Sequence, residues 1–262
     1  MRIGMPALVE YNTLDQLIDL CMELKLDFIE LNMNLPYNFI GKLNPGLLKK
    51  TTEETGIEFT MHMPDEADLG VFYESVRRGY EELFSETIEW AGLAGISLLN
   101  MHVIEGAKMT LPDKKVYIYQ EYSREFKNNF IKSIKTLSEK AVKSNVALAV
   151  ENSANFGKAY IQDALNEAVL YPNVGLTWDT GHDAVSGFTD REFLMIHEKD
   201  IVHMHVHDVI GKKDHQILFR GDLDIGPLIE FAGNKNIGIL AEVKTAEALK
   251  ESIYELRTRK LI

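Results

Sequence analysis

The chain has 262 residues, of which 45% are hydrophobic and 26% are charged. This composition is typical of a globular protein and excludes a disordered or collagen-like chain. With 28 Lys and Arg against 40 Asp and Glu, the formal net charge is −12. Because an acidic surface repels polyanions, we expect no nucleic-acid partner and no binding to anionic lipid.

The sequence has no feature of an exported or membrane-embedded protein. Cys21 is the only cysteine, so an internal disulfide is excluded. The first residues lack the apolar segment of a signal peptide, and the longest run without a charge, residues 90–104, is too short to span a bilayer. We therefore expect a cytoplasmic protein without a membrane partner.

In chain order, short apolar runs bounded by turn residues alternate with longer stretches of helical spacing. The short runs predict eight strands, at residues 2–5, 28–31, 57–62, 97–102, 146–151, 174–179, 202–207 and 238–242. Between the first two strands, Thr13 and Gln16 have the spacing of a helix capping pair. Further helices are predicted at residues 83–95, 126–141, 163–170, 191–198, 227–232 and from 246 onward.

Strands that alternate with helices predict a parallel sheet with right-handed crossovers. Eight such units in about 250 residues are typical of a closed barrel. We therefore expect an α/β fold, a single (β/α)₈ TIM barrel over residues 1–262. A doubly wound open sheet is the alternative, but the sequence has neither of the glycine-rich phosphate-binding motifs typical of it. Residues 105–122 are too many for an ordinary loop and predict an active-site lid or rim segment.

Ionisable residues end six of the predicted strands, and these residues are His62, His102, Glu151, Asp179, His205 or His207, and Glu242. In a barrel the carboxyl ends of the strands meet at one mouth, where catalytic groups lie. A single histidine after a strand is more often an ordinary loop or partly buried residue. Glu151 and Glu242 are more informative, because a carboxylate at the end of an apolar strand is seldom buried unless it is paired or binds a metal.

Three carboxylates and one imidazole form a set of oxygen and nitrogen ligands that suits Mn²⁺, Mg²⁺, Co²⁺ or Zn²⁺. The carboxylates would come from Glu151, Asp179 and Glu242, and the imidazole from the seventh strand. On that strand His203, His205 and His207 alternate, so we expect them to face the same way. The strand pleat alone does not decide which of the three is the ligand.

The order of several short segments along the chain is similar to that of a known family. The segments are Met61-His62-Met63-Pro64, Asn100-Met101-His102, Val150-Glu151-Asn152, Trp178-Asp179-Thr180-Gly181-His182, His205-Val206-His207-Asp208, Lys213-Asp214-His215, Gly221-Asp222-Leu223-Asp224-Ile225-Gly226 and Glu242. Together they resemble the xylose isomerase-like barrels, in particular the sugar phosphate isomerase/epimerase group, which shares its fold with endonuclease IV. The resemblance covers almost the whole chain.

The resemblance implies a role for each strand-end residue. One divalent metal is expected on Glu151, Asp179, His205 and Glu242. Glu151 and Glu242 are also expected to be catalytic, moving the proton of the substrate. Substrate contacts are expected at His62, His102, His182 and His207. Independently of the resemblance, Lys158, Arg220 and Lys244 could meet a substrate phosphate, and we include Lys244 among the substrate contacts.

The implied function is that of a metal-dependent isomerase or epimerase. It would act on a sugar or sugar phosphate through proton abstraction beside a carbonyl and an enediolate intermediate. A related dehydratase acting on an inosose is chemically adjacent. The sequence leaves open which sugar is used, whether it is phosphorylated, and whether the protein is a homo-oligomer.

Two alternatives lie outside sugar chemistry. The first is a zinc phosphodiesterase for abasic DNA like endonuclease IV, which would use His62, His102 and His182 as further zinc ligands. The acidic net charge disfavours it. In addition, Asp214 and His215 are adjacent here, whereas they are two apart in the endonuclease, so a third metal is not expected. The second alternative is a non-catalytic barrel, which the complete ligand set disfavours.

Overall fold

The computed structural model describes all 262 residues and contains a closed barrel of parallel strands. Around the barrel the strands follow the order β1-β12-β9-β8-β7-β4-β3-β2, and β2 pairs with β1. The bounds are β1 (Ile3–Pro6), β2 (Phe28–Asn32), β3 (Glu58–His62), β4 (Leu98–His102), β7 (Ala147–Glu151), β8 (Val174–Asp179), β9 (Ile201–Val206) and β12 (Gly238–Ala241). The expected (β/α)₈ class is confirmed, and each expected strand is present with its ends shifted by one residue at most.

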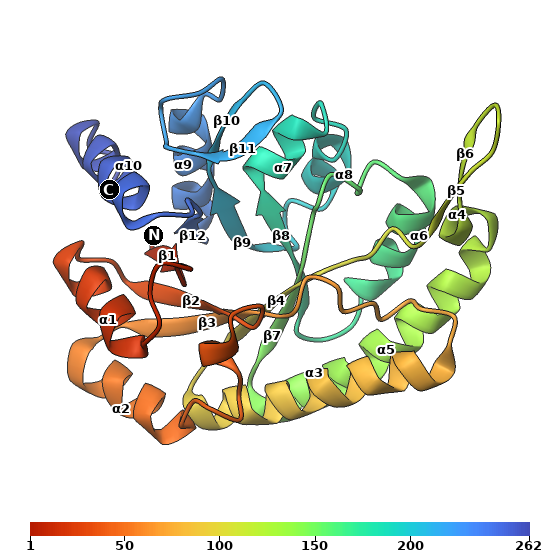
Figure 1. The fold of residues 1–262 in the computed structure, drawn as a ribbon, viewed down its shortest axis with the longest axis horizontal. Coiled ribbons are helices and arrows are strands. Elements are labelled where there is room, and N and C mark those ends of the chain that lie inside the picture. The colour runs from red at the N-terminus through yellow and green to blue at the C-terminus, as the bar shows by residue number, and fades with distance from the viewer.

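Eight helices connect the strands and surround the barrel, as Figure 1 shows. They are α1 (Leu14–Glu23), α2 (Pro45–Thr55), α3 (Glu74–Ala94), α5 (Ser123–Ser144), α6 (Ala159–Ala168), α8 (Arg191–Ile196), α9 (Ile225–Lys235) and α10 (Ala246–Thr258). The predicted capping pair is confirmed, since Thr13 Oγ1 accepts the backbone N–H of Gln16 at 3.4 Å. None of the helices is both long enough and apolar enough to cross a membrane.

Helix α2 has no counterpart among the expected helices. Only Leu48 and Thr51 of this helix are buried, so its polar residues mask the apolar spacing. The sequence nevertheless contains residues that favour the start and the end of this helix. Asn44 caps the helix through the N–H of Gly46, Pro45 opens it, and Gly56 closes it with a φ of 77°.

A contiguous cluster of 62 buried hydrophobic residues forms the core. Every residue of β1, β7 and β12 is buried or nearly so, which explains why these strands read as continuous apolar runs in the sequence. The polar side chains inside the barrel come from the middle of strands, as Glu30 and His203 do, and from their carboxyl ends, as Glu151 and Asp179 do. The core therefore holds the strand ends rigidly at one mouth.

Two antiparallel hairpins follow barrel strands at this end, and neither was predicted. The first joins β5 (Lys108–Thr110) to β6 (Lys115–Tyr117) and leads into the short helix α4 (Ile118–Glu121). It occupies the segment expected to be a lid or rim. Figure 1 shows it projecting sideways from the barrel, which is the position of a rim segment.

The second hairpin joins β10 (Asp208–Ile210) to β11 (Lys213–Gln216) and follows β9. The Asp208 carboxylate accepts the backbone N–H groups of Val209, Gly221 and Leu223 at 2.8 to 3.0 Å. A Cβ at Gly221 would lie 2.1 Å from the carbonyl oxygen of Val209, so only glycine fits there. The Gly221-Asp222-Leu223 segment thus has a structural role in fixing this hairpin beside the mouth.

Candidate metal centre

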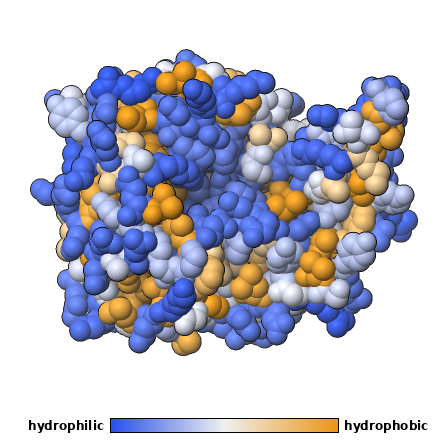
Figure 2. Space-filling model, in the orientation of Figure 1, coloured by the Kyte–Doolittle hydropathy of each residue, from blue (hydrophilic) through white to orange (hydrophobic).

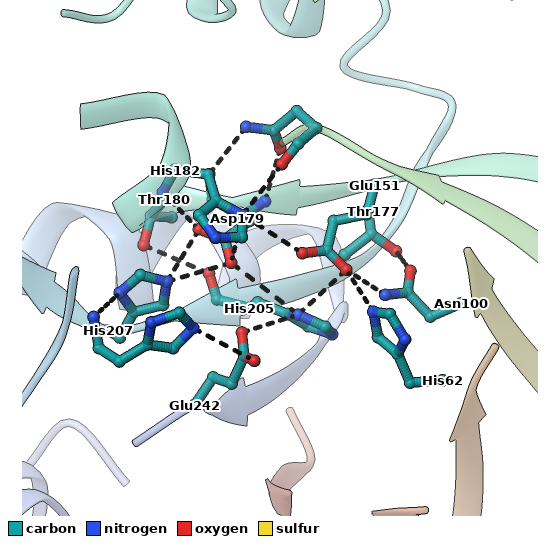
Figure 3. A network of polar contacts seen from close by, with 12 residues as sticks. His62, Asn100, Glu151, Thr177, Asp179, Thr180, His182, His205, His207 and Glu242 are labelled. Carbon is teal, nitrogen blue, oxygen red and sulfur yellow. Dashed lines mark hydrogen bonds and ion pairs between the residues drawn. The ribbon is translucent and has the colours of Figure 1, made fainter. Parts of the chain in front are cut away.

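Four strand-end side chains converge at the mouth of the barrel, as Figure 3 shows. They are the four expected metal ligands, Glu151, Asp179, His205 and Glu242, and one potential ligand atom from each lies within 4.8 Å of the others. His205 is central: its Nδ1 lies 3.1 Å from Glu242 Oε2, 3.3 Å from Glu151 Oε2 and 4.0 Å from Asp179 Oδ2. The first three of the four residues are buried, and Glu242 lies at the edge of the cluster.

The residues present fit a divalent metal. His205 Nδ1 and Glu242 Oε2 are buried and make no hydrogen bond in the protein. Buried polar atoms are seldom left without a partner, so an unpaired imidazole nitrogen facing three carboxylates is best satisfied by a cation. Oxygen and imidazole ligands in this ratio suit Mn²⁺, Mg²⁺, Co²⁺ or Zn²⁺.

The three histidines at the end of β9 lie in different surroundings. His203 and His205 both face Glu30, at 3.4 and 3.1 Å from their Nε2 atoms, so they share one side of the strand as expected. His207 follows the strand and places its Nε2 3.0 Å from Asp179. Only His205 lies among the three carboxylates, which supports it as the imidazole ligand.

His62 and His102 face Glu151 from the neighbouring strands β3 and β4. The distances from their Nε2 atoms to the carboxylate are 3.3 and 3.5 Å. His62 Nδ1 lies 2.7 Å from the carbonyl oxygen of Met63, which assigns the proton to that nitrogen and leaves Nε2 to face Glu151. With Asp65 nearby, these two histidines form a second group whose geometry could hold an ion.

A third group contains His182, His207 and His215, whose ring nitrogens also lie within 4.8 Å of one another. His182 belongs to the short helix α7 (Thr180–Val185), which Asp179 caps by accepting its N–H at 2.6 Å. From the adjacency of Asp214 and His215 we expected no third metal, and this stays a prediction. The turn of β11 directs His215 toward Glu242, at 3.5 Å, and leaves Asp214 3.9 Å from His182.

Electrostatics keep these carboxylates ionised. Burial alone would raise the pKa of Glu151, but the charges of His205 and His102 hold it well below its usual range. The same reasoning applies to Glu242, whose pKa is lowered by Lys244 and His205 against the effect of burial. For His62 and His182 burial would lower the pKa, but the facing carboxylates raise it to about 9 and about 10. In the metal-free protein His62 and His182 are therefore protonated at neutral pH, and a metal ion bound beside them would compete with these protons.

Three residues of the site were missed in the sequence. Glu30, on β2, is 3% exposed and accepts a hydrogen bond from Thr60 at 3.0 Å in addition to its contacts with the histidines of β9. Asn100 donates a hydrogen bond to Glu151 and accepts one from Thr177 at 2.6 Å, and His215 reaches Glu242. Glu30 could have been found, because a carboxylate inside the apolar run Phe28-Ile29-Glu30-Leu31 is as unusual as Glu151.

A cavity of about 160 Å³ opens beside the cluster, between the ends of β1, β2 and β12. Glu242 and Lys244 line one side of it, and Leu8 and Asn34 line the other. Lys244 Nζ lies 2.5 Å from Glu242 Oε1, so the expected substrate contact is placed at the cavity. Lys158 and Arg220 pair instead with Glu105 and Glu251, at 3.3 and 2.6 Å, and do not line this cavity.

The fold and this cluster define the chain as a (β/α)₈ barrel with potential metal ligands at its strand ends. A family model described as xylose isomerase-like TIM barrel matches residues 18–258, so the chain belongs to this family and the expected resemblance is confirmed. Among curated proteins, none matches the sequence.

Solved structures share the fold over essentially their whole length. A D-tagatose 3-epimerase-like protein has a TM-score of 0.77 and 20% identity, with all of both chains covered. The 3-keto-D-glucoside 4-epimerase YcjR from E. coli has a TM-score of 0.77 and 18% identity over 98% of this chain and 99% of its own. The IOLI protein with a bound zinc atom has a TM-score of 0.75 and 16% identity, over 100% of this chain and 98% of its own. At these identities the similarity shows the fold alone.

Proposed function

We propose that the protein is a divalent-metal-dependent isomerase or epimerase of a sugar or sugar phosphate. The observation that carries this proposal is the placement of two ionised carboxylates, Glu151 and Glu242, on either side of His205 at 3.3 and 3.1 Å. Two carboxylates flanking one site can take a proton from one face of a substrate carbon and return one to the other face. Relatives in fold whose names include sugar epimerases support the assignment.

The reaction requires removal of a proton from a carbon next to a carbonyl. Glu151, Asp179, His205 and Glu242 would hold a divalent ion, which would supply Lewis-acid stabilisation of negative charge on the substrate oxygens. Glu151 and Glu242 are both ionised, because neighbouring positive charges lower their pKa values, so each would be in the form that can accept a proton. Asn100 orients Glu151, Lys244 orients Glu242, and His62, His102, His182 and His207 line the site where substrate hydroxyls would bind.

A second candidate is a zinc phosphodiesterase. The two additional histidine groups, His62 with His102 and His182 with His207 and His215, favour it, because they surround the central cluster on both sides. The net charge of −12 opposes it, since binding to a DNA backbone depends on neutralising phosphates.

Solvent exchange distinguishes these functions. The metal-loaded protein is incubated in deuterated water with a panel of ketoses, aldoses and their phosphates, and each product is identified by NMR. An epimerase or isomerase incorporates deuterium at the carbon next to the carbonyl and forms an isomer, whereas a dehydratase forms a product that has lost water. Metal-dependent incision of an abasic DNA duplex, with no exchange into any sugar, would refute the proposal in favour of the phosphodiesterase.

A further inference from the structure

The backbone pairing between β7 and β8 ends before it reaches the last proposed metal ligand of β8. Glu151 closes β7 and is paired with Thr177, whereas β8 continues to Asp179. On its other side Asp179 pairs with His205 of β9. On the β7 side the last backbone bond runs from the Asn152 N–H to the Thr177 carbonyl and is long, at 3.4 Å. Backbone pairing alone therefore does not fix Glu151 and Asp179 relative to each other.

The side chain of Asn152 takes the place of the missing backbone bonds. Its Oδ1 accepts the backbone N–H of Asp179 at 2.7 Å, and its Nδ2 donates to the Asp179 carbonyl at 3.0 Å. One amide thus binds both backbone groups of a proposed metal ligand. The backbone carbonyl of Asn152 faces Nδ1 of His182 instead, at 3.3 Å. Asn152 is fully buried, so solvent does not compete for these bonds.

A second buried side chain fixes the orientation of this amide. Asp190 directly precedes α8 and is fully buried. Its carboxylate accepts a hydrogen bond from Nδ2 of Asn152 at 3.3 Å and another from the backbone N–H of Gly157 at 2.9 Å. Because a carboxylate accepts hydrogen bonds and an amide both donates and accepts, Nδ2 must point toward Asp190 and Oδ1 toward the N–H of Asp179.

The loop between β7 and α6, which carries the amide, is packed on both sides. Asn155 donates to the carbonyl of Val103 at 2.7 Å, directly after β4. A Cβ at Gly157 would lie 3.0 Å from the carbonyl oxygen of Thr189. The loop therefore has little freedom to move relative to β4 and α8.

Asn152 and Asp190 lie beneath the mouth of the barrel and not at its surface. Figure 2 shows a hollow in the middle of this face, where Figure 1 shows the strand ends, and the residues around the hollow are mostly hydrophilic. Since neither side chain is exposed, neither is placed to touch a substrate in this hollow. Any effect of the pair on the site must pass through Asp179.

We propose that Asn152 and Asp190 are positioning residues, which set the place of Asp179 relative to Glu151 and thereby the affinity of the site for its metal. The amide acts on Asp179 through the backbone, and Asp190 acts through the amide. Neither residue supplies a ligand atom. This inference rests on the proposed function, because it assumes a metal ion on the four strand-end ligands.

An exchange of the two side chains tests the proposal. Asn152→Asp replaces the donor with an oxygen that opposes both the Asp179 carbonyl and Asp190, and it should weaken Mn²⁺ binding by about 10–100-fold. The variant N152D/D190N restores a donor and an acceptor between positions 152 and 190 but leaves an oxygen opposite the Asp179 carbonyl. It should therefore regain unfolding temperature relative to N152D and still bind Mn²⁺ weakly. Thermal unfolding and isothermal titration measure these two effects.

The absorption spectrum of bound Co²⁺ provides a second measurement, because it depends on the geometry of the ligands. It should differ from the wild-type spectrum in both variants. Asn129→Leu is the matched control, since the amide of Asn129 donates to the Val71 carbonyl at 3.2 Å and makes no hydrogen bond to a ligand residue. This variant should keep the wild-type affinity and spectrum.

Two results would overturn the inference alone. One is wild-type Mn²⁺ affinity and Co²⁺ spectrum in N152D. The other is recovery of both in N152D/D190N, because Asn152 would then act only by holding the loop to Asp190. A wild type that binds neither ion would overturn the proposed function, and this inference with it.

Discussion

Glu151 receives more contacts than any other residue of the site. His62, His102 and His205 approach its two oxygens, and Asn100 donates a hydrogen bond to one of them. In the proposed function this one carboxylate has two roles, as a metal ligand and as a carrier of the substrate proton. Its exchange for an amide of the same size therefore tests both roles without creating a cavity.

We predict that Glu151→Gln and Glu242→Gln each lower kcat/KM by about 10²–10⁴-fold while the fold is retained, because each removes a base in contact with the substrate proton. The exposed residue Glu139 on α5 offers a matched control, since Glu139→Gln removes a carboxylate without touching the site. A variant of either site residue that keeps more than about a tenth of the activity, a loss below about 1.4 kcal/mol, would exclude that residue as a proton carrier.

Glu30 lies inside the barrel, next to the proposed metal ligand His205. It faces the Nε2 of His205 at 3.1 Å, so its negative charge favours the tautomer whose Nδ1 is free to bind the ion. We predict that Glu30→Gln weakens Mn²⁺ binding by about 10–100-fold, although no ligand atom is removed. Isothermal titration measures this change.

Thr60→Val provides the control for Glu30. It removes only the hydroxyl that donates to the same carboxylate, at 3.0 Å, and should change the affinity for Mn²⁺ much less. Equal affinities in the wild type and Glu30→Gln would show that Glu30 has no influence on the ion.

At the scale of elements, the turn from β8 into α7 is the most tightly packed part of the site. A Cβ at Gly181 would lie 1.9 Å from Cε1 of His207, whose position is fixed by Asp179 on one side and the N–H of His215 on the other. We predict that Gly181→Ala displaces this imidazole and lowers kcat/KM by at least tenfold. Gly187→Ala is the control, because a Cβ at Gly187 would contact no other atom. Since the φ of Gly187 is 75°, this substitution should lower the stability of the fold and leave kcat/KM unchanged.

The sequence predicted the barrel strands well because they are apolar on both faces and bounded by turn residues. It missed α2, whose buried side is only two residues wide, and both hairpins, whose strands have three or four residues. The strand-end rule located Glu151, Asp179 and Glu242 and left the histidine of the seventh strand open, and the family resemblance selected His205. The rule did not locate Glu30, which lies inside a strand, or His215, which a hairpin folds back toward the mouth. Where a hairpin places its side chains depends on tertiary contacts, and the local sequence pattern does not predict these contacts.

At the scale of the whole molecule, the mouth gathers negative charge on a chain that is already acidic. Three buried carboxylates, Glu30, Glu151 and Asp179, and the partly exposed carboxylate of Glu242 lie within or next to the cluster. In the metal-free protein the protonated imidazoles of His62, His182 and His205 lie beside them, and a bound metal ion would supply positive charge in their place. Stability should therefore respond differently to pH in the two forms.

We predict that the metal-free protein loses stability as pH rises from 6 to 9. Burial would lower the pKa of His62, but Glu151 raises it to about 9, above the 6.5 of the unfolded chain. Because protonated His62 is favoured in the folded state, it stabilises the fold fully below pH 6.5. This stabilisation, on the order of 3 kcal/mol, is lost as pH rises through about 9.

Bound Mn²⁺ should add about 4 kcal/mol to the free energy of unfolding when its concentration is a thousand times its dissociation constant. The affinity for Mn²⁺ should increase with pH, because the imidazoles must be neutral to bind it. Urea unfolding with EDTA and with Mn²⁺ at pH 6 and pH 9 measures both effects. The difference between the two forms should be larger at pH 9, and parallel pH profiles would show that protons and metal do not compete for these side chains.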